Sequence, residues 1–242
     1  MRAGYEAQPL GKARPNYLLR TLCEEMGFLG NRENYYESQN SFLSDVLDRR
    51  TGLPIMLSLV CMAVGRRLGA EVDGIGFPNH FMARYRDSEG EWLLDAFNGQ
   101  LLLPETVSTY LSSIFGQSIQ LSAAAFRPMT AALVAQRILN NLRNVYLAEQ
   151  NYVMATRTLD FSLALTPLNP LPWQERALLH LELQEFEPAS RDLRRYFFLT
   201  GQLGLALGIE EEQVELEQIL DDQERQLFDT FNRIEEMRTR LN

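Results

Sequence analysis

The C-terminal half of the chain repeats itself. When residues 142–201 are compared with themselves at a shift of 34 positions, residues of similar kind fall opposite one another. The matching pairs are Tyr146 with His180, Tyr152 with Phe186, Ala155 with Ala189, and Leu159 with Leu193. Such a period constrains the fold, because each unit buries its apolar face only against its neighbours. We therefore expect a stack of similar units here.

The residue types in the repeat favour paired helices. Ala155 and Ala189 are small enough to let two helices approach closely, and an aromatic residue lies three positions before each. A 34-residue period with these residues resembles the tetratricopeptide repeat, in which each unit is a helix–turn–helix. His180 occupies a position of aromatic packing, so we interpret it as a core residue. Two repeats bury little surface alone, so we expect neighbouring elements to cover their ends.

Residues 210–242 predict a long amphipathic helix. Its apolar residues recur every seven positions, with Leu216 and Met237 beside them: Leu220, Leu227, Ile234 and Leu241. The acidic residues at 210–212 suit the start of a helix. A helix of this kind would cap the repeats. The same pattern also fits a coiled-coil homodimer through residues 210–242, and the sequence leaves both interpretations open.

The N-terminal half has a different pattern. Residues 54–68 predict a buried helix, with Pro54 in the first turn and Gly69 at the stop. Three strands are then expected, separated by turn-forming residues at 78–79 and 86–90. Their expected ranges are 72–77, 80–85 and 91–96. A helix followed by strands with short connections predicts an α+β core with an antiparallel sheet.

Composition excludes several classes of protein. A net charge of −9 argues against binding to nucleic acid or to anionic membrane surfaces, and it favours a protein partner with basic patches. Only Cys23 and Cys61 are present, so we expect no disulfide framework and a reducing, cytoplasmic location. The longest apolar run, residues 55–64, is too short to span a bilayer.

Motifs in the N-terminal half resemble those of a known family. They are Gly27-Phe28-Leu29-Gly30-Asn31-Arg32, Tyr35-Tyr36, Asn40-Ser41, Asp45-Val46-Leu47-Asp48-Arg49-Arg50, Gly52-Leu53-Pro54-Ile55, Pro78-Asn79-His80-Phe81 and Asp95-Ala96-Phe97-Asn98-Gly99. Together with the repeats, these motifs resemble the SirB-type transglutaminase-like proteins over residues 17–201. The resemblance implies a papain-like α+β core of helices and an antiparallel sheet, followed by an all-α repeat segment and a C-terminal helix.

These observations divide the chain into four expected parts. Residues 1–16 lack a clear period and are interpreted as a loose arm. The remaining parts are a transglutaminase-like domain over 17–125, two tetratricopeptide-type repeats over 126–202, and a C-terminal amphipathic helix over 203–242.

The resemblance also implies a candidate site. The wider family has a Cys at the start of the helix, then a His and an Asp, and His80 and Asp95 match the last two. Pro54 stands at the Cys position, and members of the SirB-type branch generally carry Pro there too. Cys61 lies seven residues further, about 10.5 Å along a helix, so it is badly placed to replace the missing thiol.

Other side chains are expected around the same cleft. These candidate lining residues are Arg32, Asn40, Asp45, Pro54 and Cys61. One His and isolated acids do not have the spacing of a zinc site, and we expect neither a metal nor a cofactor.

Three functions remain open at this stage. The first is a non-catalytic module, a pseudoenzyme that binds a protein partner through its degenerate domain and its repeats. The second is a hydrolase or acyltransferase in which His80 acts as a general base, oriented by Asp95. The third is a structural protein that self-associates through its C-terminal helix. In the first, His80 and Asp95 would be a buried pair that holds two strands in register.

Overall fold

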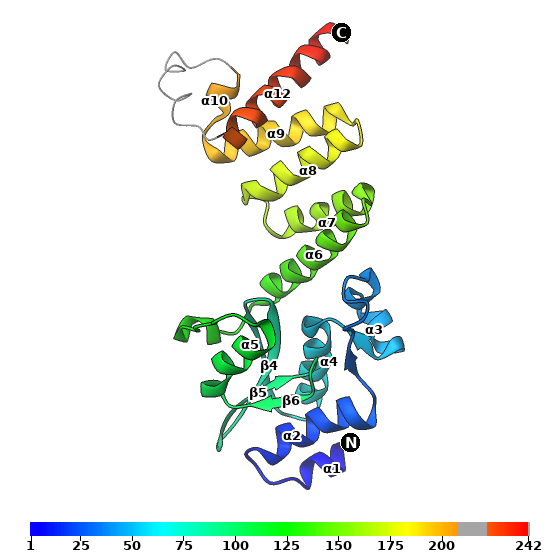
Figure 1. Cartoon of the computed structure of the whole chain (residues 1–242), viewed down its shortest axis with the longest axis vertical. Coiled ribbons are helices and arrows are strands. Elements are labelled where there is room, and N and C mark those ends of the chain that lie inside the picture. Colours follow the sequence, from blue (N-terminus) through cyan, green and yellow to red (C-terminus); the bar gives the residue numbers. More distant parts are fainter. Residues whose placement is uncertain (208–221, 242) are drawn as a thin grey trace. The chain divides into compact units, whose positions relative to one another are not determined.

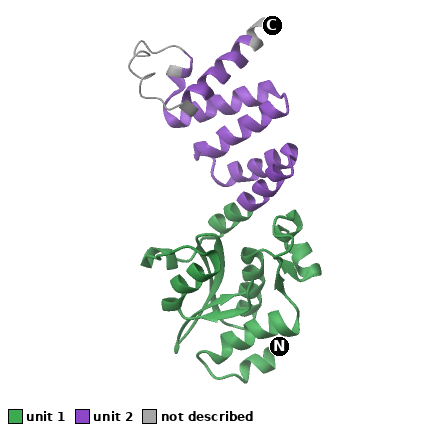
Figure 2. Cartoon of the chain, viewed as in Figure 1, with its two compact units in different colours: residues 1–138 green, residues 139–242 purple. Residues whose placement is uncertain are grey.

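The computed structural model describes residues 1–207 and 222–241. It divides into two compact units, Met1–Ile138 (unit 1) and Leu139–Asn242 (unit 2), which Figures 1 and 2 show. The division falls later than the expected start of the repeats at residue 126. The reason is packing, because Val134 and Ile138, in the first part of helix α6 (Ala131–Ala148), still belong to the core of unit 1.

A four-stranded antiparallel sheet lies at the centre of unit 1. Its strands, in spatial order, are β3 (Glu71–Phe77), β4 (His80–Asp87), β5 (Gly90–Asp95) and β6 (Gln100–Leu102). The three predicted strands are confirmed, and the short β6 is added. Because β4 and β5 are antiparallel, the start of β4 and the end of β5 lie at the same end of the sheet. This topology brings His80 and Asp95 together.

Helices cover both faces of this sheet (Figure 1). The buried helix α4 (Pro54–Arg67) packs on one face, where Phe81, Ala83 and Tyr85 of β4 point. Helix α5 (Val107–Phe115) packs on the other face, where Met82 joins a smaller core. Alternate residues of a strand point to opposite faces, so β4 contributes to both cores. The α+β fold class predicted from the sequence is confirmed.

The first residues of the chain are ordered, which corrects the expected loose arm. Residues Arg2–Glu6 form α1, and Tyr5 is buried with its hydroxyl 2.9 Å from the hydroxyl of Tyr85. The backbone N–H of Gly11 donates to Oδ2 of Asp87 at 2.8 Å. A single buried aromatic residue anchors this segment, and one residue produces no period that could be recognised in a sequence.

Short elements complete unit 1. Helix α2 (Ala13–Arg20) continues into a π-helical turn, η1 (Thr21–Glu25). The other elements are a parallel pair β1 (Leu29–Gly30) and β2 (Thr51–Gly52), α3 (Leu43–Arg49), and the 3-10 turns η2 (Ser38–Ser41), η3 (Pro104–Thr106) and η4 (Ala123–Phe126).

Unit 2 is helical, as the repeat predicts. After the second part of α6 come α7 (Tyr152–Leu165), α8 (Pro170–Glu182), α9 (Phe186–Thr200) and the short α10 (Leu203–Ala206). Ala155 and Ala189 are fully buried, which confirms that small residues allow close helix contacts. The side chains of Asn151 and Asn169 cap α7 and α8 by accepting backbone N–H groups.

Helix α12 (Asp222–Leu241) packs against α9. The rings of Phe197 and Phe228 stack with their centroids 4.6 Å apart, and Phe231 is buried beside them. Leu227 and Ile234, two members of the seven-residue pattern, are buried in the same cluster. The predicted capping position therefore agrees with this packing. Leu216 and Leu220 lie outside the described residues.

Within the ranges that the structure describes, no helix combines the length and the hydropathy needed to cross a membrane.

Candidate functional site

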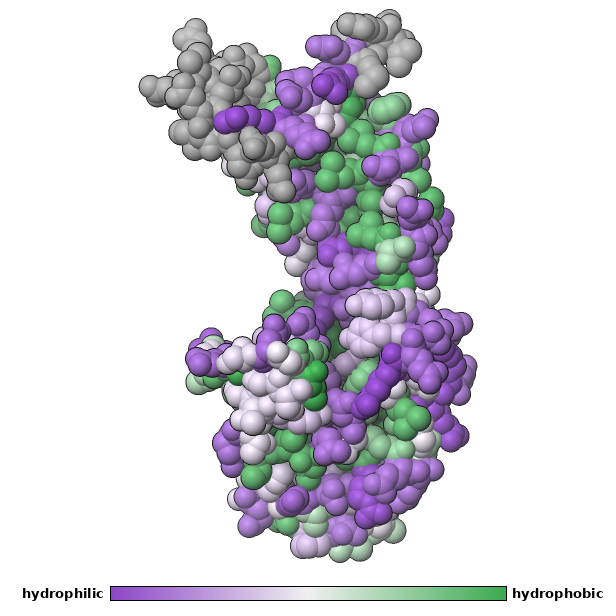
Figure 3. All heavy atoms as spheres, viewed as in Figure 1, coloured by the Kyte–Doolittle hydropathy of each residue, from purple (hydrophilic) through white to green (hydrophobic). Residues whose placement is uncertain are grey.

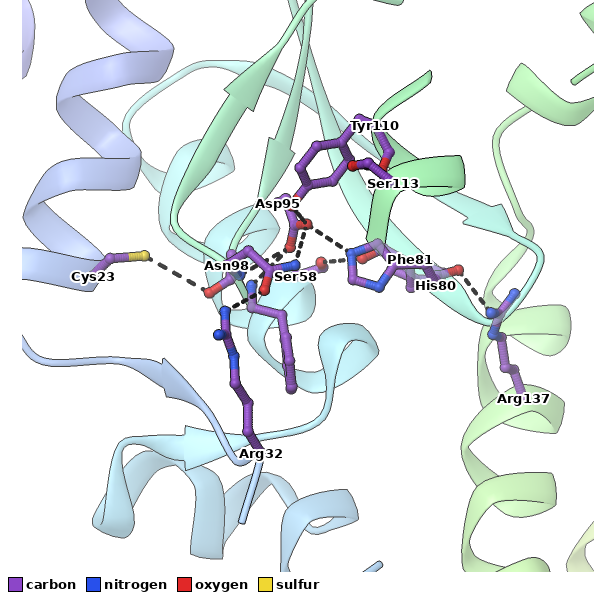
Figure 4. Close-up of polar contacts among 12 residues, drawn as sticks. Cys23, Arg32, Ser58, His80, Phe81, Asp95, Asn98, Tyr110, Ser113 and Arg137 are labelled. Atoms are coloured by element: carbon purple, nitrogen blue, oxygen red, sulfur yellow. Dashed lines mark hydrogen bonds and ion pairs between the residues drawn. The ribbon is translucent and has the colours of Figure 1, made fainter. Parts of the chain in front are cut away.

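His80 and Asp95 form a hydrogen-bonded pair at one end of the sheet (Figure 4). The distance between Nε2 of His80 and Oδ2 of Asp95 is 2.8 Å. His80 is 4% exposed and Asp95 is 0% exposed. The pair therefore lies almost entirely away from solvent, at the end of the sheet where β4 begins and β5 ends.

Asp95 is held by four further hydrogen bonds. Its Oδ1 accepts the backbone N–H groups of Phe97 and Asn98, each at 3.1 Å. Its Oδ2 accepts Nδ2 of Asn98 at 2.8 Å and the hydroxyl of Tyr110 at 2.7 Å. A buried carboxylate needs such partners, because leaving a charge without them in a protein interior is costly.

These contacts decide the protonation state of Asp95. Burial alone would raise its pKa, but the hydrogen bond and charge of His80, with the hydrogen bonds of Asn98 and Tyr110, lower the pKa below its usual value. Because a carboxylate can only accept, the proton of the His80 ring lies on Nε2 when the ring is neutral. Nδ1 is then the unprotonated nitrogen of His80.

Tyr110 also belongs to the site, although no pattern in the sequence predicts it. Burial raises its pKa well above the usual range, and the charge of Asp95 adds to the shift. The phenol therefore stays protonated and donates. Tyr110 lies on α5, and neither a motif nor a period links it to Asp95. Asn98, by contrast, lies in the Asp95–Gly99 motif, so the sequence carried a signal for it.

The backbone of His80 is fixed from a second direction. Nη2 of Arg137 donates to the carbonyl oxygens of Phe77 at 2.8 Å and of His80 at 2.7 Å. These carbonyls belong to the end of β3 and the start of β4, so one guanidinium binds both sides of the turn that joins the two strands. Arg137 lies in α6, 57 residues after His80, so no local pattern in the sequence links the two residues.

Neither cysteine is suited to act as a nucleophile. Cys61 is 0% exposed, and burial raises its pKa far above the usual value, as expected for a thiol two turns into α4. Burial, with smaller contributions from Asp95 and Glu24, raises the pKa of Cys23 to about 11. Figure 4 shows Cys23 and His80 on opposite sides of Asp95 and Asn98. The thiolate is the reactive form, and the raised pKa of each thiol disfavours it.

Pro54 is buried at the first position of α4, where its missing N–H is harmless. One turn further, the hydroxyl of Ser58 donates to the carbonyl of Phe81 at 3.2 Å, next to His80. The site thus has a His and a carboxylate, and a proline at the helix start that the wider family fills with Cys.

The other predicted lining residues divide into two groups. Arg32 joins the pair, since its Nη2 donates to Oδ1 of Asn98 at 2.5 Å. Asn40 is buried in the neighbouring loop, where Nδ2 donates to the carbonyls of Asn34 and Tyr35. Asp45 lies in the first turn of α3 and makes no hydrogen bond to these groups in the described part of the chain.

Metal binding receives no support from the arrangement of ligands. Among the residues whose positions are described, no three His, Cys, Asp or Glu side chains are grouped so that they could hold a metal ion.

A helix, an antiparallel sheet and a His–Asp pair, in that chain order, define a class of protein. A family profile described as "Transglutaminase-like superfamily" matches residues 2–140, and one described as "Tetratricopeptide repeat" matches residues 142–214. The chain belongs to the transglutaminase-like superfamily, and it carries tetratricopeptide repeats after that domain.

Two relatives of similar length identify a branch of this superfamily that the chain resembles. The chain is 35% identical to "UPF0162 protein" of Xylella fastidiosa (strain 9a5c) over 196 residues, which cover 79% of this chain and 68% of the relative. It is 27% identical to "Protein SirB1" of Salmonella typhimurium over 177 residues, 73% of this chain and 66% of the relative. The predicted resemblance to SirB-type proteins is thereby confirmed.

A third relative is much longer than this chain. The chain is 34% identical to "F-box only protein 21" of Mus musculus over 179 residues, which cover 69% of this chain but 27% of the relative. No solved structure matches the chain.

Proposed function

We propose that the protein is a non-catalytic module that binds a protein partner, built from a degenerate transglutaminase-like domain and helical repeats. The observation that carries this proposal is the combination of Pro54 at the start of α4 with a fully buried Cys61 and a partly buried Cys23, both with raised pKa values. Acyl transfer through a thiol needs a thiolate beside the His. Here the position that would supply it holds a side chain without any nucleophilic atom.

The His80–Asp95 pair has a structural role in this proposal. Its members come from β4 and β5, and Asp95 also fixes the turn at Phe97 and Asn98. Removing either partner would leave a buried polar group without its hydrogen bond. A requirement for folding therefore accounts for both residues without any reaction.

The repeats are the element that suits partner binding. Stacked helical hairpins present extended surfaces for other polypeptides. The net charge of −9 favours a partner with basic patches. Two free cysteines suit a reducing compartment, so we place the protein in the cytoplasm.

Affinity capture with the full chain as bait tests the binding part. The variant Leu171→Ser/Leu178→Ser changes two exposed apolar side chains of α8, and Leu29→Ser is a matched exposed apolar control in unit 1. We expect the α8 variant to lose the partners of the wild type, while Leu29→Ser and His80→Gln retain them. Identical partners for the α8 variant and the wild type would contradict a role for the repeats.

One observation favours an enzyme as the second candidate. Asp95 holds His80 at 2.8 Å in the tautomer that leaves Nδ1 unprotonated, as a general base requires. Hydrolysis of p-nitrophenyl acetate and of an amide-containing peptide tests it. The binding module predicts equal rates for the wild type and His80→Gln. A loss of about tenfold or more in His80→Gln would favour the hydrolase or acyltransferase.

Self-association through residues 210–242 is the third candidate. Leu227 and Ile234 are already buried against other helices of unit 2, so these two side chains are used within the chain. Light scattering of the full chain tests it: a dimer would support this candidate, and a strictly monomeric chain would contradict it.

A further inference from the structure

The only Asn-Gly pair in the sequence lies beside the buried Asp95. Asn98 and Gly99 end the short connection, residues 96–99, that joins β5 to β6. An Asn followed by Gly can modify itself, because the backbone nitrogen of the next residue can attack Cγ of the Asn and close a succinimide ring. Gly favours this reaction, since it has no Cβ to obstruct the attacking nitrogen. The groups around Asn98 decide whether the attack is helped or hindered.

The side-chain carbonyl of Asn98 is bound by a cation. Nη2 of Arg32 donates to Oδ1 of Asn98 at 2.5 Å (Figure 4). Attack at Cγ turns this carbonyl oxygen into an oxyanion, and a guanidinium stabilises an oxyanion more strongly than it stabilises a neutral amide. The contact with Arg32 therefore lowers the energy of the tetrahedral intermediate and favours the attack.

The side-chain nitrogen of Asn98 is bound to a group that can supply a proton. Nδ2 of Asn98 donates to Oδ2 of Asp95 at 2.8 Å, and the same oxygen lies 2.8 Å from Nε2 of His80. Once Nδ1 of His80 has taken up a proton from water, the proton on Nε2 can pass through Asp95 to Nδ2. Nδ2 must gain this proton to leave as ammonia, so the His80–Asp95 pair assists its departure.

Water can reach the connection between β5 and β6. Gly99 is exposed and Asn98 is half-buried, although Asp95 is not accessible. Hydrophilic residues are spread over the face of unit 1 that Figure 3 shows, so this surface is hydrated. A succinimide formed at Asn98 would therefore meet the water that opens it.

Asn40 is a similar amide that is held without such help. Its Oδ1 accepts the neutral amide of Asn31 at 3.0 Å, and its Nδ2 donates to two backbone carbonyls. A neutral donor stabilises an oxyanion less than a guanidinium does, and a backbone carbonyl relays no proton. The next residue is Ser41, whose Cβ obstructs the attack. Asn40 is therefore an internal control for a bound but unassisted amide.

We propose that Asn98 and Gly99 form a self-modification site, at which the chain converts Asn98 into a residue with a carboxylate. The backbone nitrogen of Gly99 forms a bond to Cγ of Asn98 and loses its proton to water. The bond from Cγ to Nδ2 breaks, and ammonia leaves with the proton received through Asp95. Water then opens the succinimide and gives either Asp or isoaspartate at position 98. The reaction consumes water and releases ammonia without a change of oxidation state. It acts on the chain itself and goes beyond the proposed binding of a partner.

The conversion changes the environment of the buried pair. Asp95 loses the donor Nδ2 and gains a negative neighbour, which disfavours its own charge. Isoaspartate also adds a main-chain carbon to the connection, and this displaces the N–H groups of Phe97 and Asn98 from Oδ1 of Asp95. Each change weakens unit 1, so the reaction sets a finite lifetime for the intact site.

Peptide mapping by mass spectrometry tests the site, with the full chain incubated at neutral pH for increasing times. The deamidated fraction is followed at Asn98 and at Asn40, both in buffer and in urea that unfolds the chain. We expect Asn98 to react faster in the folded chain than in urea, because the contacts with Arg32 and Asp95 exist only in the folded state. Asn40 is expected to react more slowly than Asn98 under both conditions.

Arg32→Gln tests the source of the acceleration. In the folded chain we expect it to slow the deamidation of Asn98 about tenfold, since the oxyanion loses its charged donor. In urea the variant and the wild type are expected to react at the same rate. Arg20→Gln is the matched control, because Arg20 is also exposed but pairs with Glu24, and we expect it to leave the rate unchanged. Both arginines are exposed, so circular dichroism of each variant is expected to match the wild type.

Two results overturn the site. Slower reaction of Asn98 in the folded wild type than in urea shows that the fold protects the amide. A faster or unchanged rate in folded Arg32→Gln shows that the guanidinium restrains the amide or does not act on it. Partner capture through α8 stands in either case, because it depends on unit 2 and not on Asn98.

Discussion

Both histidines of the chain contact a carboxylate at a similar distance, and the two pairs differ in the burial of that carboxylate and in its other partners. Nε2 of His80 is 2.8 Å from Asp95 in unit 1, and Nδ1 of His180 is 2.6 Å from Glu185 in unit 2. The side chains of Asp95 and Glu185 are 0% and 49% exposed, respectively. Asp95 of β5 binds groups from β4, from α5 and from the turn at residues 97–98, whereas Glu185 lies five residues after its partner. Burial and connectivity, not distance, therefore decide what such a pair contributes.

The largest expected effect is a loss of stability that distinguishes the His80–Asp95 pair from the His180–Glu185 pair. We expect Asp95→Ala to destabilise unit 1 by about 3–5 kcal/mol, because it leaves several buried donors without a partner. Glu185→Ala is the matched control and should cost under about 0.5 kcal/mol in unit 2. The chain has one tryptophan in each unit, so urea unfolding followed by Trp92 in a Trp173→Phe background reports unit 1. Trp173 in a Trp92→Phe background reports unit 2. Similar losses for both variants would remove the distinction.

The next effect tests the backbone support of His80. We expect Arg137→Ala to destabilise unit 1 by about 2 kcal/mol, since two carbonyls lose a charged donor. Arg143→Ala, which removes an ion pair with Glu175 in unit 2, is the control with a smaller loss. The same Trp92 measurement applies. A change confined to unit 2 would contradict the contact of Arg137 with the hairpin.

Lowering the pH is expected to remove gradually the contribution of ionised Asp95 to the stability of unit 1. The pKa of Asp95 in the folded protein is lower than its usual 3.8. Its contribution to stability is therefore complete above that value and is lost as the pH falls through the lower, folded pKa. In the Trp173→Phe background, acid titration of Trp92 fluorescence is expected to show this loss with Asp95 present but not in Asp95→Asn. Parallel curves for both proteins would contradict the lowered pKa.

The smallest expected effect on stability is that of restoring a cysteine at position 54. Pro54→Cys should cost under about 1 kcal/mol, because the first helical position makes no intrahelical N–H bond. In a Cys23→Ser/Cys61→Ala background, we expect the new thiol to react with iodoacetamide faster than Cys23 does in the wild type, since a helix N-terminus stabilises the thiolate. Pro170→Cys, at the first residue of α8, is the control for the effect of a helix N-terminus without His80. Equal rates at the two positions would show that His80 adds nothing.

The fold and the central pair could be predicted, because their signals are local. The period of the repeats, the turn at Pro78-Asn79 and the helix over 54–68 each depend on neighbouring residues. His80 and Asp95 came from motifs shared with a family. Tyr5, Tyr110 and Arg137 were missed, because each acts through a contact with a distant segment and lies in no period of its own. His180 was expected to pack as a core residue, yet it pairs with Glu185, which the repeat pattern does not encode.

The hydrogen bond between Tyr5 and Tyr85 has a consequence for the order in which the protein assembles. It joins residues 80 positions apart, so α1 cannot reach its final place during synthesis until β4 has left the ribosome. The helical hairpins of unit 2 close over a few tens of residues, and each can form as it emerges. The first segment to be made in unit 1 is thus among the last to be secured. A nascent chain halted before residue 85 is expected to present α1 as an accessible target for chaperones or proteases.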